Sequence, residues 1–248
     1  MILSVHTQVN GPTGLILAVG KGILRTMYNN SSAIADIIPV DMVINLMISA
    51  AWYTVEQQPN KIQIYNCTTS TINPLTWGKV GELTLTNFVK YPSAQVFRHP
   101  GGSFKDSQIV NQICVFYDQL LPVYILDFLQ LVFGQKRFIR RIYGKVEKAV
   151  EVLEYFTTRQ WYFKCGNVVN LRELLSDQEQ EIFFFDVRKI CWNDYWVNYV
   201  KGSRKFVLKE DESTYPQARE NLKRIKLFTS LIKVTIVCII LMIIWKLF

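Results

Sequence analysis

The sequence predicts an α/β fold that is followed by an all-α domain and a C-terminal transmembrane helix. Within residues 1–95, short apolar runs typical of β-strands alternate with helical patterns. After residue 112 the strand signals stop and helical periodicity takes over. The last apolar run, Leu227–Leu247, carries no charge between Val234 and Trp245 and is long enough to cross a hydrocarbon core of about 30 Å.

The composition indicates a membrane-associated or lipid-handling protein. Of the 248 residues, 50% are hydrophobic and only 19% are charged. The net charge of +8 suits anionic lipids or phosphate-bearing ligands, and the sequence has no nucleic-acid-binding motif, so we expect no nucleic acid partner. Five widely spaced cysteines without a C-x-x-C pair, together with two histidines, predict neither a disulfide framework nor a metal site.

Residues 1–95 are expected to hold two short strands and two helices after the first turn. The runs "ADIIPV" (residues 35–40) and "KIQIYNC" (residues 61–67) have the pattern of strands. One helix is predicted to start with Asp41 as its cap and to run to Trp52. The other is predicted from Pro74 to about Tyr91.

A linker is predicted at residues 96–112, where Pro100-Gly101-Gly102 is the strongest break in the chain. The all-α domain then covers residues 113–210. Its first apolar stretch, residues 117–134, is interrupted by Asp118, Pro122 and Asp127. A packed helix pair, an interfacial helix and a second membrane span are all open alternatives for this stretch.

Two further helical patterns belong to the same domain. Residues 145–161 form an amphipathic helix, and Ser176 or Asp177, with Glu179 or Gln180 behind it, caps a later one. The later pattern carries a helical aromatic stripe, for which core packing is expected and an acyl-chain lining is the alternative. The stripe consists of Phe183, Phe184, Phe185, Trp192, Tyr195, Trp196 and Tyr199.

Residues 211–226 are predicted to be a charged linker before the transmembrane helix. The basic residues Lys223, Arg224 and Lys226 directly precede the apolar run. This arrangement predicts a single C-terminal span with the preceding domains on the cytosolic side.

The stretch from Val9 to Met27 contains four glycines and raises the question of a phosphate-binding turn. A dinucleotide fingerprint requires G-x-G-x-x-G or G-x-x-G-x-x-G. Gly11 and Gly14 fit this spacing, but Leu17 occupies the third place, and Gly20 and Gly22 come too late. A glycine-rich turn near a ligand, or a plain turn before a helix, is therefore favoured over a nucleotide site.

Long blocks of the sequence resemble the alcohol-forming fatty acyl-CoA reductases, with the insect-type members the most similar. The blocks are "NGPTGLILAVGKGILRTMYNNSSAIADIIPVDMVINLMISAAW", "IQIYNCTTSTINPLTWGKV", "FTTRQW", "FFFDVR" and "NYVKGSRKFVLKED". The resemblance covers residues 11 to about 210. It implies that residues 1–95 are the end of a partial Rossmann-type reductase domain, and that residues 113–210 are the family's C-terminal helical domain.

The resemblance implies a reaction in which NADPH reduces a long-chain fatty acyl-CoA to a fatty alcohol. In this short-chain-dehydrogenase-like family, a Tyr-x-x-x-Lys pair supplies the proton to the developing oxyanion. None of the 12 tyrosines of this chain has a lysine at the fourth following place. We therefore expect this chain to be a truncated reductase that has neither the catalytic residues nor the cofactor-binding glycine motif. We also expect that this chain alone does not bind NADPH and is not active.

The resemblance places the first glycine turn on the substrate side of the reductase domain. Gly11, Gly14, Lys21 and Arg25 are the candidates there, with Lys21 and Arg25 one helical turn apart and able to face CoA phosphates. The alternative for this pair is a solvated helix face. A second basic group, Lys136, Arg137, Arg140 and Arg141, is the candidate for contact with an anionic membrane surface, and a charged exposed face is its alternative.

The expected partners are long-chain fatty acyl-CoA and the lipid bilayer, and a homo-oligomer stays open. The family resemblance implies the endoplasmic reticulum or the peroxisome as the membrane. A different class of function is the alternative: a non-catalytic, tail-anchored protein that binds lipid or acts as a scaffold.

Overall fold

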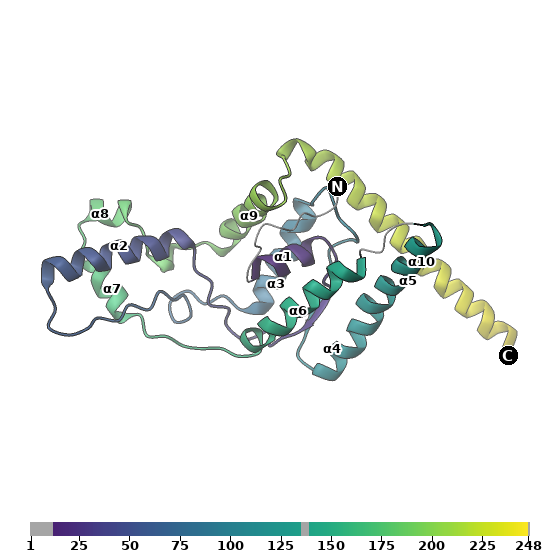
Figure 1. Ribbon diagram of the computed structural model, residues 1–248, viewed down its shortest axis with the longest axis horizontal. Coiled ribbons are helices and arrows are strands. Elements are labelled where there is room, and N and C mark those ends of the chain that lie inside the picture. Colours follow the sequence, from purple (N-terminus) through teal and green to yellow (C-terminus); the bar gives the residue numbers. More distant parts are fainter. Residues whose placement is uncertain (1–11, 135–138, 248) are drawn as a thin grey trace. The chain divides into compact units, whose positions relative to one another are not determined.

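The computed structural model describes residues 12–134 and 139–247, and within the last helix it describes only part of the side chains. Helices dominate, and the described residues contain one small parallel sheet of two strands (Figure 1). The strands are β1 (Thr26–Tyr28) and β2 (Ser103–Lys105), paired in the register Thr26 with Ser103, Met27 with Phe104 and Tyr28 with Lys105. The expected α/β character is therefore present in a reduced form.

Ten α-helices lie along the described chain. They are α1 (Pro12–Gly20), α2 (Val40–Gln57), α3 (Trp77–Lys90), α4 (Gln108–Val115), α5 (Leu121–Val132), α6 (Ile139–Thr157), α7 (Gly166–Glu173), α8 (Asp177–Ile182), α9 (Trp192–Gly202) and α10 (Tyr215–Leu247). Short π- and 3₁₀-helical segments accompany them: η1 (Phe116–Leu120), η2 (Val187–Lys189), η3 (Ser203–Val207) and η4 (Glu212–Thr214).

The chain divides into two compact units, each built from separate stretches of sequence. Unit 1 consists of Met1–Tyr28, Gly81–Glu154 and Trp196–Phe248, and unit 2 consists of Asn29–Val80 and Tyr155–Tyr195. The predicted linker, residues 96–112, lies within unit 1 and contains β2. The domain boundaries expected from the sequence, at residues 95, 112, 210 and 226, stay predictions.

The core of unit 1 forms where α6 packs beside α1 and the strands (Figure 1). Leu15, Ala18, Leu24 and Met27 are its buried members. On α6, the residues that face them are Val146, Ala149, Val150 and Leu153, whose spacing is that of one helical face. The amphipathic helix predicted at residues 145–161 is thus confirmed, with its end at Thr157.

The core of unit 2 forms between α2, α7 and the segment that follows α8. Met42 and Leu46 on α2 pack with Leu171, Leu175, Phe185 and Val187. The two helices predicted for the N-terminal region are confirmed as α2 and α3. Asp41, however, lies within the first turn of α2 instead of before it, and Pro39 occupies the cap position.

The two strands predicted in unit 2 were wrong. Residues 61–67 do not form a strand, because this segment is held by side-chain hydrogen bonds and not by a partner strand. Asn167 Nδ2 donates to the carbonyl oxygen of Ile64, and Asn66 Nδ2 donates to the carbonyl oxygen of Lys164, both at 2.9 Å. In residues 35–40, the Asp36 carboxylate accepts hydrogen bonds from Thr68 and Thr69 instead.

The segment that precedes the predicted C-terminal span is helical. Helix α10 starts at Tyr215, so most of the predicted charged linker, residues 211–226, belongs to this helix. The predicted transmembrane segment, Leu227–Leu247, forms the rest of α10, and its spanning role stays a prediction. Within the described part of the chain, the helical stretch Gln108–Val132 is long and apolar enough to cross a membrane.

Candidate functional site

The residues expected on the substrate side lie around the end of α1 and the start of β1, in unit 1. Gly11 lies outside the described residues, and Gly14 is in the first turns of α1. Lys21 follows α1 directly, and Arg25 precedes β1. The expectation that Lys21 and Arg25 share one helical turn was wrong, because α1 ends at Gly20.

Lys21 is an interior residue of unit 1. Only 4% of it is exposed, and its carbonyl oxygen accepts hydrogen bonds from the backbone N–H groups of Phe97 and Arg98. Burial lowers the pKa of the Lys21 ammonium, and the negative charge of Glu210 opposes this shift. A ligand phosphate in solvent therefore has little access to Lys21.

Arg25 has a second arginine, Arg98, beside it. Arg25 Nη1 donates to the carbonyl oxygen of His99 at 3.1 Å, and Arg98 Nη1 donates to that of Asp118 at 2.8 Å. Burial and, to a smaller extent, the nearby charge of Arg25 lower the pKa of Arg98 to about 10, although the charge of Asp118 opposes the shift. Among the described residues, both guanidinium groups donate hydrogen bonds to backbone carbonyl oxygens, and the nearby charge of Asp118 offsets only part of their positive charge.

Sequence reasoning missed Arg98 because it lies in the predicted linker, 73 residues from Arg25. The two come together because residues 97 and 98 bond to the carbonyl oxygen of Lys21 and because β2 pairs with β1. No local sequence signal reports such a long-range pairing.

The glycine motif expected for a dinucleotide is incomplete at α1. Leu17, which stands where a cofactor turn needs glycine, is buried, and a side chain at this place blocks the close helix packing that the glycine permits. At the start of the helix, the hydroxyl groups of Thr13 and Tyr199 are 2.5 Å apart. The described residues also contain no group of three or more His, Cys, Asp or Glu side chains that could hold a metal ion.

The expected membrane-surface group is described in part. Lys136 and Arg137 lie outside the described residues, whereas Arg140 and Arg141 are exposed at the start of α6. The guanidinium of Arg140 lies 5.3 Å from the centre of the Tyr124 ring, which belongs to the apolar helix α5. A cation is thus held next to an apolar surface within unit 1.

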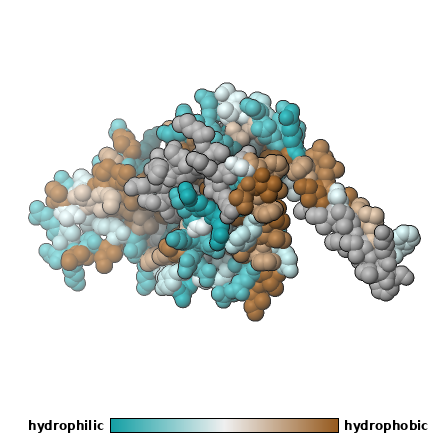
Figure 2. Space-filling view, turned by 45° about the vertical axis from the view of Figure 1, so that its right-hand side comes forward, coloured by the Kyte–Doolittle hydropathy of each residue, from teal (hydrophilic) through white to brown (hydrophobic). Residues whose placement is uncertain are grey.

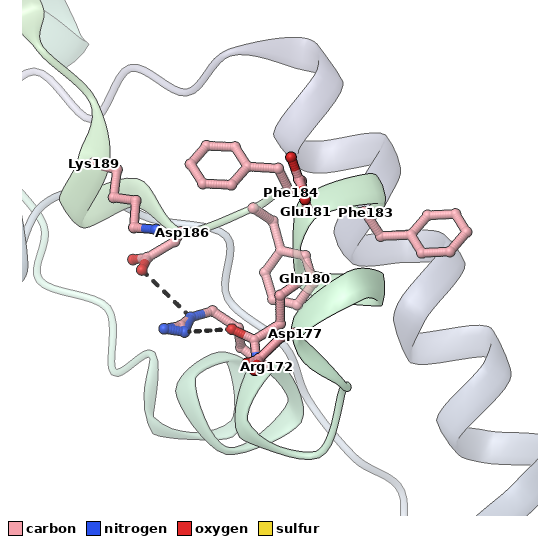
Figure 3. Close-up of a pocket in the computed structure, with 9 residues that line it drawn as sticks. Arg172, Asp177, Gln180, Glu181, Phe183, Phe184, Asp186 and Lys189 are labelled. Carbon is pink, nitrogen blue, oxygen red and sulfur yellow. Dashed lines mark hydrogen bonds and ion pairs between the residues drawn. The ribbon is translucent and has the colours of Figure 1, made fainter.

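Unit 2 contains a pocket of about 390 Å³ at the C-terminal end of α7 (Figure 3). Two cations, Arg172 and Lys189, line it with three phenylalanines and three carboxylates. Arg172 already donates to Gln180 Oε1 at 3.0 Å and lies 3.4 Å from Asp186 Oδ2. Since carboxylates outnumber cations, the pocket is poorly suited to a polyphosphate such as that of CoA.

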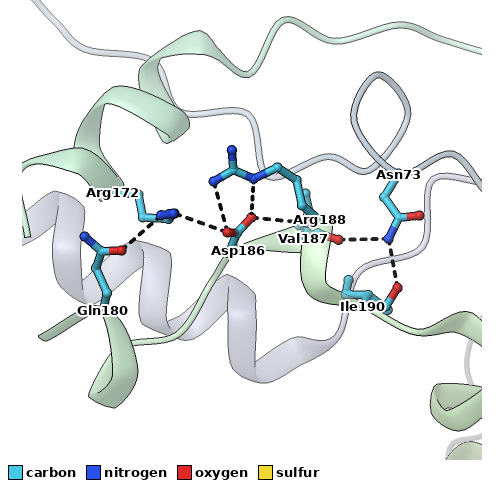
Figure 4. A network of polar contacts seen from close by, with 7 residues as sticks. All are labelled: Asn73, Arg172, Gln180, Asp186, Val187, Arg188 and Ile190. Atoms are coloured by element: carbon cyan, nitrogen blue, oxygen red, sulfur yellow. Dashed lines mark hydrogen bonds and ion pairs between the residues drawn. The ribbon is translucent and has the colours of Figure 1, made fainter. Parts of the chain in front are cut away.

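The polar network next to this pocket holds unit 2 together (Figure 4). Arg188 donates two hydrogen bonds to the Asp186 carboxylate, from Nε at 2.8 Å and from Nη2 at 3.0 Å. Burial by itself would raise the pKa of Asp186, but the hydrogen bonds from Arg188 and the charges of Arg172 and Arg188 outweigh it and lower the pKa.

Asn73 joins two of the sequence blocks in the same network. Its Nδ2 donates to the carbonyl oxygens of Val187 and Ile190, each at 2.9 Å, and its Oδ1 accepts from Trp192 Nε1 at 3.0 Å. Asn73, in the block "IQIYNCTTSTINPLTWGKV", is thus hydrogen-bonded to Val187 of the block "FFFDVR".

The aromatic stripe is not one helical face. Helix α8 ends at Ile182, so Phe183–Phe185 lie outside a helix, and they belong to unit 2 whereas Trp196 and Tyr199 belong to unit 1. Core packing is confirmed for Phe185 and for Trp196, whose Nε1 donates to Thr84 Oγ1 at 3.0 Å. The predicted cap is confirmed as a capping box formed by Ser176 and Glu179.

Two family models match the chain, and both are described as "Male sterility protein". One matches residues 118–210, and the other, of NAD-binding type, matches residues 4–47. Together they match more than half of the chain.

Similar full-length proteins carry the name fatty acyl-CoA reductase. Fatty acyl-CoA reductase 1 of Rattus norvegicus is 37% identical over 239 residues, which are 96% of this chain and 46% of that protein. Fatty acyl-CoA reductase 2 of Bos taurus is 37% identical over 219 residues, 88% of this chain and 42% of that protein. Fatty acyl-CoA reductase 1 of Gallus gallus is 34% identical over 239 residues, which are 96% of this chain and 46% of that protein.

The chain spans less than half the length of these relatives, and the closer similarity to insect-type members stays a prediction. The matches nevertheless extend over most of the chain, since the Rattus norvegicus relative covers 96% of it. The chain therefore belongs to the fatty acyl-CoA reductase family and matches the C-terminal portion of its members.

Proposed function

We propose that this chain forms the substrate side of a fatty acyl-CoA reductase. The observation that carries the proposal is the 37% identity to a fatty acyl-CoA reductase over 96% of the chain. In the proposed reaction, NADPH reduces a long-chain fatty acyl-CoA to a fatty alcohol. The sequence contains neither a Tyr-x-x-x-Lys pair nor a G-x-x-G-x-x-G motif, so in this proposal the chain by itself neither catalyses the reduction nor binds NADPH.

Arg25 and Arg98 are the groups that we propose for the CoA phosphates. Arginine recognises phosphate oxygens through planar, charge-assisted hydrogen bonds, and the hydrogen bonds that these two guanidinium groups donate within the described chain go to neutral carbonyl oxygens. Burial argues against the same role for Lys21. Gly11 and Gly14 stay candidates for the adjoining turn.

The C-terminal part of α10, Leu227–Leu247, is the proposed membrane anchor. Its residues are apolar over the length that a bilayer core requires, and Lys223, Arg224 and Lys226 precede it on the side proposed to be cytosolic. The membrane is that of the endoplasmic reticulum or the peroxisome in this proposal, and a homo-oligomer is compatible with it.

Acyl-CoA turnover and acyl-CoA binding test the two parts of the proposal. We expect the purified chain in detergent, supplied with hexadecanoyl-CoA and NADPH, to show no NADPH oxidation. Robust turnover would overturn the argument from the missing tyrosine–lysine pair.

Calorimetric titration with the same acyl-CoA is expected to show binding. Arg25→Gln or Arg98→Gln should weaken it by about tenfold to a hundredfold, because a charge-assisted hydrogen bond contributes about 1.5–3 kcal/mol. Lys61→Gln, at an exposed lysine of unit 2, is the control and should leave the affinity unchanged. If the unaltered chain binds no acyl-CoA, the alternative of a non-catalytic scaffold replaces the proposal.

A further inference from the structure

The helical stretch Gln108–Val132, made of α4, η1 and α5, has an inverted distribution of polarity. Its two buried side chains are polar: Gln119 is 1% exposed and Asp127 is 7% exposed. Its large apolar side chains face outward, with Ile109, Tyr117, Phe128 and Val132 each more than 60% exposed. A surface helix of a water-soluble domain has the opposite distribution, so the outer face of this stretch is built for an apolar medium.

The polar face fixes the stretch along the side of unit 1. Gln119 accepts a hydrogen bond from the backbone N–H of Arg25 at 3.0 Å and donates one to the carbonyl oxygen of Thr26 at 3.1 Å. About two helical turns before Gln119, Asn111 Oδ1 accepts a hydrogen bond from Thr26 Oγ1 at 3.0 Å. Helix α4 also contacts both strands, so the helix is attached to the sheet near its middle.

This attachment decides between the alternatives that the sequence left open. If Gln108–Val132 crossed a bilayer, Gln119 would lie near the midplane and would bring Arg25 and β1 with it. Placing the charge of Arg25 and the backbone groups of a sheet edge at the midplane is costly. The exposure of the apolar face argues against a helix packed in the core of unit 1, because only 11% of its most apolar stretch is buried. An interfacial position is the one that satisfies both faces.

Positive charge lies beside the apolar face. Arg140, Arg141, Lys145 and Lys148 are exposed on α6, and Arg140 is held over the ring of Tyr124. Figure 2 shows a brown, apolar band directly adjoining teal, hydrophilic surface on the face turned toward the viewer. Apolar side chains that enter the acyl region, with basic side chains at headgroup level, are the pattern of an interfacial helix on an anionic bilayer.

We propose that the outer face of Gln108–Val132 is a second membrane-contacting surface, which lies flat in the headgroup region of an anionic bilayer with α6 supplying the cations. This inference rests on the proposed membrane residence of the chain. It adds a contact that holds unit 1 against the membrane independently of the C-terminal anchor.

Depth-dependent fluorescence quenching in the full chain tests the proposal. With the five native cysteines replaced by serine, single cysteines at Phe128, Leu241 and Ile62 carry an environment-sensitive dye in phosphatidylcholine–phosphatidylserine vesicles. Phe128 reports the proposed surface, Leu241 reports the anchor, and Ile62, an exposed apolar residue of unit 2, is the control. Lipids with a quencher near the headgroup or near the end of the acyl chain give the depth.

We expect the shallow quencher to act on Phe128, the deep quencher to act on Leu241, and neither to act on Ile62. Arg140→Gln with Arg141→Gln should lower the docking equilibrium at Phe128 by about thirtyfold in anionic vesicles and leave the depth of Leu241 unchanged. No quenching at Phe128, with deep quenching at Leu241, would refute the second surface and leave the anchor standing.

The other outcomes separate the two proposals further. Shallow quenching at Phe128 without quenching at Leu241 would support the surface and refute the anchor. Deep quenching at Phe128 would identify a membrane span and overturn the interfacial position. Dye-to-dye energy transfer at Phe128 without lipid quenching would show that a second copy of the chain covers the face, which also overturns the proposal.

Discussion

Arg204 lies in the interior of unit 1, with only 1% of it exposed. Its Nε lies 3.0 Å from Glu210 Oε2, its Nη2 donates to Thr214 at 2.8 Å, and its guanidinium lies 4.0 Å from the centre of the Tyr215 ring. Glu210 also accepts hydrogen bonds from Ser93 and Ala94. These contacts explain why the block "NYVKGSRKFVLKED" contains an arginine and a glutamate six residues apart.

Removal of the Glu210 charge should therefore be strongly destabilising. Glu210→Gln leaves the Arg204 cation buried without its counterion, which costs about 3–5 kcal/mol of unfolding free energy. The matched control is Glu220→Gln, because Glu220 pairs with Arg224 at a distance of four residues on the exposed surface of α10. The control should change stability by less than about 0.5 kcal/mol. Thermal unfolding in detergent compares the two, and equal losses would contradict this account.

Asp186 in unit 2 should make stability depend on pH. Its folded-state pKa lies below its ordinary value of 3.8, so the ionised form stabilises the fold above that pH, and the stabilisation is lost as the pH falls through the folded-state pKa. Asp186→Asn should lower the unfolding free energy by about 1–2 kcal/mol near neutral pH, because Arg188 is half exposed and solvent screens the pair.

The difference between Asp186→Asn and the unaltered chain should shrink as the pH falls below 3.8. Unfolding midpoints measured from neutral to acid pH check this, with Glu181→Gln as the control at an exposed carboxylate of the same pocket. A deficit that stays constant across the whole pH range would show that Asp186 acts through packing and not through charge.

At the level of the elements, the approach of Gly102 to Arg25 determines whether β2 pairs with β1. Gly102 has a φ of +127°, and a Cβ built on it would lie 1.7 Å from the carbonyl oxygen of Arg25. That same carbonyl oxygen accepts the hydrogen bond from the backbone N–H of Ser103 that opens the parallel pair. A side chain at residue 102 is thus excluded both by backbone conformation and by space.

Gly102→Ala is expected to destabilise unit 1 by about 3 kcal/mol or more, because the backbone must move. Gly144→Ala is the contrasting variant: Gly144 lies within α6, and a Cβ there would meet nothing within 4 Å. It should stabilise the protein by about 0.5–1 kcal/mol through helix propensity. Circular dichroism during thermal unfolding checks both signs, and a tolerated Gly102→Ala would refute the close packing.

For the whole molecule, the division into two units predicts two cooperative regions of local unfolding. Asn73→Asp removes the donor to Val187 and Ile190 in unit 2 but keeps the acceptor for Trp192. Amide hydrogen exchange should accelerate by about tenfold to a hundredfold in residues 29–80 and 155–195, and stay unchanged in α4 and α5 of unit 1.

The reciprocal variant is Trp196→Phe, which removes the donor to Thr84 in unit 1. Its effect should appear in α3 beyond residue 80 and in α9 beyond residue 195, and spare the α2–α7 core of unit 2. Exchange that rises throughout the chain in both variants would show a single cooperative unit instead.

The sequence by itself determined helices α2, α3 and α6, a cap at Ser176 or Asp177, and the family. Helices α2, α3 and α6 follow from apolar periodicity, and a helix closes its hydrogen bonds within one short stretch of chain. The capping box is local for the same reason, since its two partners are three residues apart. The family was recognisable because the resemblance extends over several long blocks of sequence, such as "NYVKGSRKFVLKED".

Only the tertiary structure decided which residues the strands pair with, which arginines meet and which face of residues 108–132 is outward. Residues 61–67 alternate like a strand, but a strand exists only where a second strand bonds to it, and here side chains of Asn66 and Asn167 bond instead. Arg25 meets Arg98 because residues far apart in sequence pair as β1 and β2. Likewise, Gln119 turns the apolar face of its helix outward through bonds to Arg25 and Thr26, and such long-range contacts leave no period or spacing in the sequence.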